Sequence, residues 1–136
     1  LLISSSSLQN VEIPKELIPN IIDEIPILSI AGIFADGKFL VRNAEELRHK
    51  ESDRITAMCC NFKKLGFECN EYKDGFEVFG EIKNNDVLIE TYGDHRIAMS
   101  FAILGLLTDK NIKIDNFECV AVSNPEFINQ INAITQ

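Results

Sequence analysis

Two stretches of this sequence are apolar on almost every side, and they limit the possible folds more than any other feature. They run over Ile25–Ala35 and Ile97–Leu107. Each is long enough for about three helical turns, and a helix that is apolar all round is normally buried on all sides. We therefore expect two helices inside the molecule. An acidic residue, Asp23 or Asp94, stands ahead of each helix, where an N-cap or first-turn carboxylate is typical.

The two apolar stretches belong to a longer internal repeat with an offset of 73 residues. Each is followed by a strand, an Asn-x-Glu triplet, a polar segment and a further helix, at Lys38, Asn43 and Ile55 in the first copy and at Asn111, Asn116 and Ile128 in the second. This offset is too long for a solenoid repeat of about 20–50 residues. It indicates a duplicated βαβαββ unit, with one copy at about 10–80 and a second at about 86–136 that lacks its last two strands.

Shorter patterns predict the other elements of an α/β (α+β) fold. Alternation predicts strands near 10–13, 38–42, 87–91 and 112–114, and a hairpin of 67–73 with 75–80 around Asp74-Gly75. Helical spacing predicts a helix from Ile55 to Leu65 with Gly66 as its stop, and a last helix opened by Pro125. The charged residues 44–51 between them predict a loop or a first helical turn.

Charge and composition exclude several classes of protein. The chain has 13 Lys and Arg against 21 Asp and Glu, a net charge of −8, which argues against nucleic acid or an anionic membrane surface as the main partner. No apolar run approaches the ~18–20 residues that span a bilayer, and no signal peptide is apparent. The sequence begins with Leu1 instead of Met, so we expect it to be part of a longer chain.

The cysteines predict neither a metal site nor a disulfide framework. Cys59, Cys60, Cys69 and Cys119 form no C-x-x-C pair, and the chain has only two histidines. We expect these thiols to act as small apolar core residues, in a protein of the reducing cytoplasm.

Three charged clusters lie at predicted helix starts, where free backbone N–H groups and the helix dipole favour anions. They are 23–24, 48–54 and 94–96. Lys50, Arg54 and Arg96 oppose the dipole there, and such breaks of a local rule tend to mark functional sites. The pattern is consistent with a pocket for a small anion, with Asp23 and Glu51 as proton-transfer groups. The alternative is that all of them are solvated helix caps and surface ion pairs.

Three strings carry a resemblance to a known family: "IIDEIPIL" at 21–28, "LRHKESDRI" at 47–55 and "GDHRIAM" at 93–99. Together, in this order and spacing, they resemble the EPSP synthases (3-phosphoshikimate 1-carboxyvinyltransferases), over about Ile13 to Phe127. The resemblance implies transfer of the enolpyruvyl group of phosphoenolpyruvate to the 5-hydroxyl of shikimate 3-phosphate, with release of phosphate and without a metal or organic cofactor. It also implies the inside-out barrel of the enolpyruvyl transferases, with buried helices and sheets outside.

The same resemblance assigns this chain to the C-terminal third of the family enzyme, in the domain on the phosphoenolpyruvate side. It implies that Asp23 takes the hydroxyl proton and contacts shikimate 3-phosphate, that Lys50 contacts the same substrate, and that Glu51 handles the proton at the methylene carbon. Because the other domain supplies most of the shikimate 3-phosphate site, we expect the fragment to be inactive alone.

Arg54 and Arg96 match the two arginines that hold phosphoenolpyruvate in the family, and His95 matches a neighbouring active-site histidine. Two positions depart from the family pattern. Some members carry a Lys in the segment that is 121–125 here, which contains none, and some carry an Asn where this chain has Glu46.

Two other functions stay open from the sequence. One is a sister enolpyruvyl transferase with another acceptor, such as UDP-N-acetylglucosamine. The other is a non-catalytic anion-binding module, although Asp23 and Glu51 have no use in simple anion binding. We expect the full-length enzyme to be a monomer and the isolated fragment to self-associate, because the missing strands leave a sheet edge open.

Overall fold

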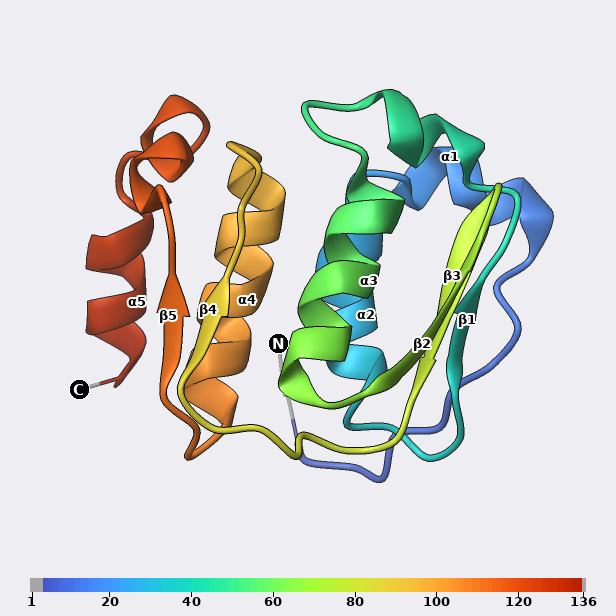
Figure 1. The fold of residues 1–136 in the computed structure, drawn as a ribbon, viewed down its shortest axis with the longest axis horizontal. Coiled ribbons are helices and arrows are strands. Elements are labelled where there is room, and N and C mark those ends of the chain that lie inside the picture. Colours follow the sequence, from blue (N-terminus) through green and yellow to red (C-terminus); the bar gives the residue numbers. More distant parts are fainter. Residues whose placement is uncertain (1–3, 136) are drawn as a thin grey trace.

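The computed structural model describes residues 4–135 and has the mixed helix and sheet content that the sequence predicts (Figure 1). Its longer helices are α2 (Ile25–Gly32), α3 (Arg54–Leu65), α4 (His95–Leu107) and α5 (Phe127–Thr135). The short helices are α1 (Ile18–Ile21) and three 3-10 helices, η1 (Lys15–Leu17), η2 (Glu45–His49) and η3 (Phe117–Val122). The strands are β1 (Phe39–Val41), β2 (Glu68–Tyr72), β3 (Gly75–Phe79), β4 (Val87–Ile89) and β5 (Ile112–Ile114).

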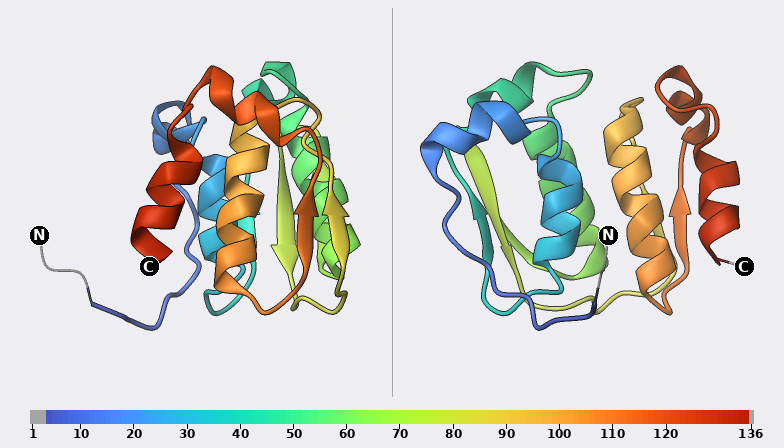
Figure 2. Two further views of the ribbon diagram at one scale, coloured as in Figure 1. Left: turned by 90° about the vertical axis from the view of Figure 1, so that its left-hand side faces the viewer. Right: turned by 180° about the vertical axis from the view of Figure 1, so that it is seen from behind.

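The strands form two separate sheets with helices between them. Antiparallel strands in the order β1-β3-β2 make one sheet, and the parallel pair β4-β5 makes the other. α2 packs against α4, α3 packs on β2 and β3, and α4 packs on β5. In Figures 1 and 2 the four longer helices run in the same direction and begin at one end of the molecule. That end therefore collects the positive ends of several helix dipoles.

The internal repeat is visible in the backbone. Phe39 and Ile112 both begin a strand, and Arg54 and Phe127 both begin a helix, 73 residues apart in each case. η2 and η3 occupy the polar segments that follow the Asn-x-Glu triplets. Asn43 and Asn116 open these segments with left-handed backbone, at φ 60° and φ 36°. Asn tolerates this region better than most residues, which explains its presence at both positions.

α3 has clear start and stop signals. The side chain of Asp53 accepts a hydrogen bond from the backbone N–H of Thr56, at 3.1 Å, and caps the first turn. Gly66 follows the last turn at φ 100°, a left-handed conformation that glycine adopts at little cost. The predicted stop at Gly66 is confirmed.

One aromatic cluster joins the two repeat units into a single core. Phe62 of α3 lies with its ring centroid 5.6 Å from Phe67, 6.4 Å from Phe76 and 5.6 Å from Phe101 of α4. Phe62, Phe76 and Phe101 are fully buried. Since Phe101 belongs to the second unit and the others to the first, the two units share one core.

Two expectations about the bounds of elements are wrong. The segment 10–13 is not a strand, and only Gln9 forms a parallel bridge, to Asp36. The pairing ends at Asn10, whose N–H donates to Asp36 O at 3.0 Å, because Asp36 belongs to no strand; Pro14 follows as the N-cap of η1. α2 ends at Gly32 and not at residue 35.

The apolar helices are also not buried all round within the described residues. Ile27 and Leu28 of α2 are 38% and 37% exposed, and Leu106 and Leu107 of α4 are 47% and 56% exposed. Each helix thus has one face packed in the core and one apolar face toward solvent in this chain.

Candidate active site

The charged residues singled out in the sequence meet at the end of the molecule where α2, α3 and α4 begin. The centre of the cluster is Arg54, the first residue of α3, which is only 1% exposed. Its Nη1 donates to Asp23 at 2.9 Å, its Nη2 to Glu51 at 2.6 Å, and its Nε to Asp94 at 2.8 Å. One guanidinium therefore holds three carboxylates from three segments of the chain.

Electrostatics favour the charged form of Arg54 despite its burial. Burial alone would lower the pKa of the guanidinium, but the hydrogen bonds and charges of Asp94, Glu51 and Asp23 outweigh it and the pKa is raised. The cation is permanent, and each surrounding carboxylate is held by it.

Asp94 is the inner partner of Arg54 and is completely buried. It caps α4 by accepting from the backbone N–H of Arg96 at 2.9 Å, and it accepts from the Ser52 hydroxyl at 3.0 Å. Burial would raise the pKa of Asp94, but Arg54 and these hydrogen bonds reverse the effect and lower it. The N-cap role expected for Asp94 is confirmed.

Asp23 does not cap α2. Glu24 occupies the N-cap position, without a side-chain hydrogen bond to the helix. The carboxylate of Asp23 lies 3.5 Å from Lys50 Nζ and 3.8 Å from Arg96 Nη2, in addition to its bond with Arg54. The expectation of a cap is wrong because three cations attract this side chain away from the helix start. Burial opposes ionisation of Asp23, but Arg54, Arg96 and Lys50 together lower its pKa.

Arg96 and Lys50 flank Asp23 with part of their charge accessible. The guanidinium of Arg96 donates to the backbone oxygen of Asp23 at 2.8 Å and lies 3.5 Å from Glu24, and its side chain is 33% exposed. Lys50 pairs with Glu46, and this hydrogen bond raises the pKa of the ammonium group. The departure at Glu46 thus places a competing anion on Lys50.

Five of the six residues expected to act in catalysis or binding are joined by hydrogen bonds or ion pairs: Asp23, Lys50, Glu51, Arg54 and Arg96. His95 is different. It is the first residue of α4 and half-buried, next to this cluster along the chain, but no hydrogen bond or ion pair within residues 4–135 involves its side chain.

Two residues that build the cluster have no catalytic or binding role among the sequence-based predictions. Asp94 is predicted only as a helix cap, and Ser52 is only part of a charged run. Their contact joins positions 42 residues apart in sequence. The signal available was the string Asp94-His95-Arg96, in which a cap residue precedes two candidate site residues.

The sequence model of EPSP synthase (3-phosphoshikimate 1-carboxyvinyltransferase) matches residues 3–131, which is nearly the whole chain. The chain belongs to the EPSP synthase family. It is 56% identical over 128 residues to the 3-phosphoshikimate 1-carboxyvinyltransferase of Petrotoga mobilis, which covers 93% of this chain and 30% of that protein. The enzyme of the same name from Aquifex aeolicus is 47% identical over 130 residues, covering 96% of this chain and 30% of the relative.

A solved EPSP synthase from Acinetobacter baumannii shares the fold. It superimposes with a TM-score of 0.86 at 39% identity, over 93% of this chain and 30% of that one. The chain therefore spans about 30% of the length of the EPSP synthases that it matches.

Two cavities near the helix starts differ in what they can hold. One of about 220 Å³ is bounded by Asp23 and Arg96 and by apolar side chains that include Ile27, Met99 and Phe127. Its volume suits a small molecule or several waters, since water occupies about 30 Å³ in the liquid. This cavity adjoins the charged cluster, because two members of the cluster line it.

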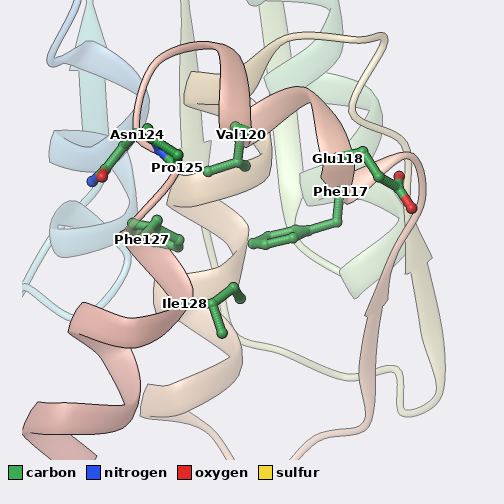
Figure 3. Close-up of a pocket in the computed structure, with 8 residues that line it drawn as sticks. Phe117, Glu118, Val120, Asn124, Pro125, Phe127 and Ile128 are labelled. Atoms are coloured by element: carbon green, nitrogen blue, oxygen red, sulfur yellow. The ribbon is translucent and has the colours of Figure 1, made fainter.

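The other cavity, also of about 220 Å³, lies between η3 and α5 (Figure 3). Phe117, Val120 and Phe127 line it, and its one charged lining residue is Glu118. It includes part of the segment 121–125, which contains no Lys. Without a cation, this cavity is unsuited to an anionic ligand.

Within residues 4–135 there is no group of three or more His, Cys, Asp or Glu side chains suited to hold a metal ion. No helix in this part of the chain is long and apolar enough to cross a membrane.

Proposed function

We propose that the protein to which this chain belongs transfers the enolpyruvyl group of phosphoenolpyruvate to the 5-hydroxyl of shikimate 3-phosphate. The observation that carries the proposal is the buried Arg54, which holds Asp23 and Glu51 at 2.9 and 2.6 Å beside the exposed edge of Arg96. Membership of the EPSP synthase family supports the same reaction. A simple anion-binding module has no use for two carboxylates among its cations.

The reaction needs two proton transfers, and the cluster offers two carboxylates. In the first step the 5-hydroxyl oxygen bonds to C2 of phosphoenolpyruvate, Asp23 takes the hydroxyl proton, and Glu51 gives a proton to C3. In the second step the bond from C2 to the phosphate oxygen breaks, phosphate leaves with the proton that Asp23 took, and C3 returns its proton to Glu51. Asp23 can act as the base because it is a carboxylate whose side chain is 41% exposed, although the cations that lower its pKa also weaken it as a base.

The cations then stabilise substrates and adduct. Both substrates are multiply anionic, and fixed cations in a closing, water-poor cleft stabilise the tetrahedral adduct that keeps their charge. Arg96 presents an exposed guanidinium edge to phosphoenolpyruvate, and Lys50 contacts shikimate 3-phosphate in place of Glu46. Arg54 already binds three carboxylates, so its contact with phosphoenolpyruvate requires that the substrate displace one of them. His95 borders the same site.

We further propose that residues 1–136 are part of the C-terminal domain on the phosphoenolpyruvate side, with repeat units at about 10–80 and 86–136. The full-length enzyme is proposed to be a monomer that works in the cytoplasm. The four cysteines of this chain are unpaired, which is consistent with a reducing compartment.

An assay of the full-length protein tests the proposed reaction. The protein is incubated with phosphoenolpyruvate and either shikimate 3-phosphate or UDP-N-acetylglucosamine, and phosphate release and the enol ether product are measured. We expect turnover when the acceptor is shikimate 3-phosphate and none when it is UDP-N-acetylglucosamine. Turnover with the sugar nucleotide alone would assign the protein to the sister activity, and binding of phosphoenolpyruvate without turnover would favour the anion-binding module.

A further inference from the structure

Asp94 occupies the inner side of the cluster, where it contacts the two repeat units at once. Its Oδ2 accepts from Arg54 Nε at 2.8 Å and from Ser52 Oγ at 3.0 Å, both in the first unit. Its Oδ1 accepts from the backbone N–H of Arg96 at 2.9 Å, in the second unit. Asp94 has no exposed surface, so substrate does not reach it in this structure.

The other two carboxylates on Arg54 are different in kind. The side chains of Asp23 and Glu51 are 41% and 51% exposed, and they face the solvent side of the guanidinium. An approaching anion can replace either of them without entering the core. Asp94 is the partner that stays in place during such an exchange, because it is buried and held by three further donors beyond Arg54 Nε, one of them a second guanidinium nitrogen at 3.3 Å.

We propose that Asp94 is a positioning residue of the transfer reaction, which anchors the guanidinium of Arg54 from behind so that its outer edge faces Asp23, Glu51 and the incoming phosphoenolpyruvate. This inference rests on the proposed function. Asp94 touches neither the reacting atoms nor the substrates, and it acts through Arg54. The anchoring also ties the start of α3 to the start of α4, and so fixes the first unit against the second.

The variant Asp94→Asn separates anchoring from helix capping. Asparagine keeps one oxygen for the N–H of Arg96, and Asn is as good an N-cap as Asp. The substitution, however, removes the negative charge, and the new amide group points its N–H donors at Arg54 Nε, which is itself a donor. The matched control is Asp53→Asn. Asp53 is the N-cap of α3, as Asp94 is of α4, so the control makes the same chemical change at the corresponding position. It removes an ion pair with Arg48 at 2.8 Å and no contact with the Arg54 side chain.

The kinetic test uses the full-length enzyme. Asp94→Asn is expected to raise KM for phosphoenolpyruvate about 10- to 100-fold, the range typical of a lost charge-assisted contact, with a smaller change in KM for shikimate 3-phosphate. Asp53→Asn is expected to change both constants less than threefold. Ser52→Ala, which removes one hydrogen bond to Asp94 and no charge, is expected to shift KM for phosphoenolpyruvate in the same direction by a smaller factor.

A double-mutant cycle decides whether Asp94 acts through Arg54. In an Arg54→Ala background there is no guanidinium to anchor, so adding Asp94→Asn is expected to leave kcat/KM unchanged. The midpoint of thermal unfolding gives a second readout: Asp94→Asn lowers it in the wild type but raises it in Arg54→Ala, where it removes an unpaired buried charge.

The outcomes separate this inference from the proposed function. If the wild-type enzyme shows no turnover, the proposed function fails, and the unfolding midpoints still report on the Asp94–Arg54 pair. If the wild type is active but the effects of Asp94→Asn and Arg54→Ala on kcat/KM multiply independently, Asp94 is not a positioning residue. Equal losses for Asp94→Asn and Asp53→Asn would reduce its role to helix capping.

Discussion

Two arginines of the same cluster illustrate how the environment of a residue decides its chemistry. Arg54 is 1% exposed and makes hydrogen bonds to three carboxylates, whereas Arg96 is one-third exposed and pairs with Asp23 and Glu24 at 3.5–3.8 Å. The buried guanidinium of Arg54 organises its neighbours, whereas that of Arg96, which makes one short hydrogen bond to the backbone oxygen of Asp23, keeps part of its surface open to a ligand. Sequence reasoning treated the two as equivalent, because spacing along the chain carries no information on burial.

Replacing Asp23 tests directly whether this residue is the base. Asp23→Asn in the full-length enzyme is expected to lower kcat by about 10²–10⁴-fold, the usual cost of losing a general base, with less effect on substrate binding. Steady-state kinetics with both substrates measures it. Glu24→Gln is the control, since Glu24 is the next carboxylate along the chain and contacts Arg96 but not Arg54. A near-normal kcat in Asp23→Asn would remove Asp23 from the mechanism.

Loss of either arginine is expected to weaken phosphoenolpyruvate binding. Arg54→Ala and Arg96→Ala should each cost roughly 1.5–3 kcal/mol in apparent affinity for phosphoenolpyruvate, with less effect on shikimate 3-phosphate. Arg42→Ala serves as control, because this exposed arginine pairs with Asp74 and not with any residue of the cluster. Equal effects on the two substrates would show that these arginines are not assigned to phosphoenolpyruvate.

Acid should lower the free energy of unfolding, because it protonates the buried carboxylate of Asp94. The pKa of Asp94 lies below 3.8 in the folded protein, so near that pH the unfolded chain binds more protons. The stability from Asp94 is therefore complete above about pH 4 and is lost as the pH falls through the folded-state pKa. Denaturant unfolding at pH 2.5–6 should show a shallower acid limb for Asp94→Asn than for Asp109→Asn, which changes an 89% exposed side chain. Identical acid limbs would contradict the assignment.

At the scale of elements, signals that act over a few residues were predictive. The hairpin of β2 and β3, the stop of α3 at Gly66 and the strand β5 follow from local spacing and turn residues. The prediction of a strand at 10–13 failed because a strand needs a partner strand, and the bridge next to this segment, from Gln9 to Asp36, meets a residue that belongs to no strand. Within the site, the candidate residues were found from their positions at helix starts, but the inner bonds of Asp94 and Ser52 depend on how α3 and α4 pack.

Two glycines with positive φ give a matched test of an element boundary. Gly66 has φ +100° and a Cβ there would lie 2.7 Å from Lys83 Cβ, whereas Gly37 has φ +84° and open space around it. Gly37→Ala should cost only the backbone strain, about 1–2 kcal/mol, and Gly66→Ala should cost more. Denaturant unfolding of the two variants measures the difference. Equal losses would mean that the segment around Lys83 moves aside freely.

At the scale of the whole molecule, exposed apolar surface is the dominant feature. The outer faces of α2 and α4 and much of α5 are apolar and open, with Leu107 at 56% and Ile134 at 76% exposure. The β4–β5 pair has no third strand within residues 4–135. Monomeric proteins rarely expose large apolar patches or bare sheet edges, because both promote association.

The isolated 136-residue chain is therefore expected to self-associate. Light scattering at dilute concentration should give a mass above 15.3 kDa. Leu28→Glu with Leu107→Glu should shift the chain toward monomer, whereas Val11→Glu, at a 76% exposed residue outside any helix or strand, should not. A clean monomer with a sharp unfolding transition in the unmodified chain would contradict this expectation.

The contact between Asp23 and Arg96 bears on how the two repeat units are held together. The two residues stand 73 positions apart but are not equivalent in the repeat, because α2 begins at Ile25 and α4 at His95, 70 positions apart. Asp23 therefore lies two residues before its helix, whereas Arg96 is the second residue of its own. Their ion pair and the hydrogen bond from Arg96 to the backbone oxygen of Asp23 join the turn before α2 to the first turn of α4. A shift of one helix along the other would therefore change the distance between the proposed base and one of the cations around it.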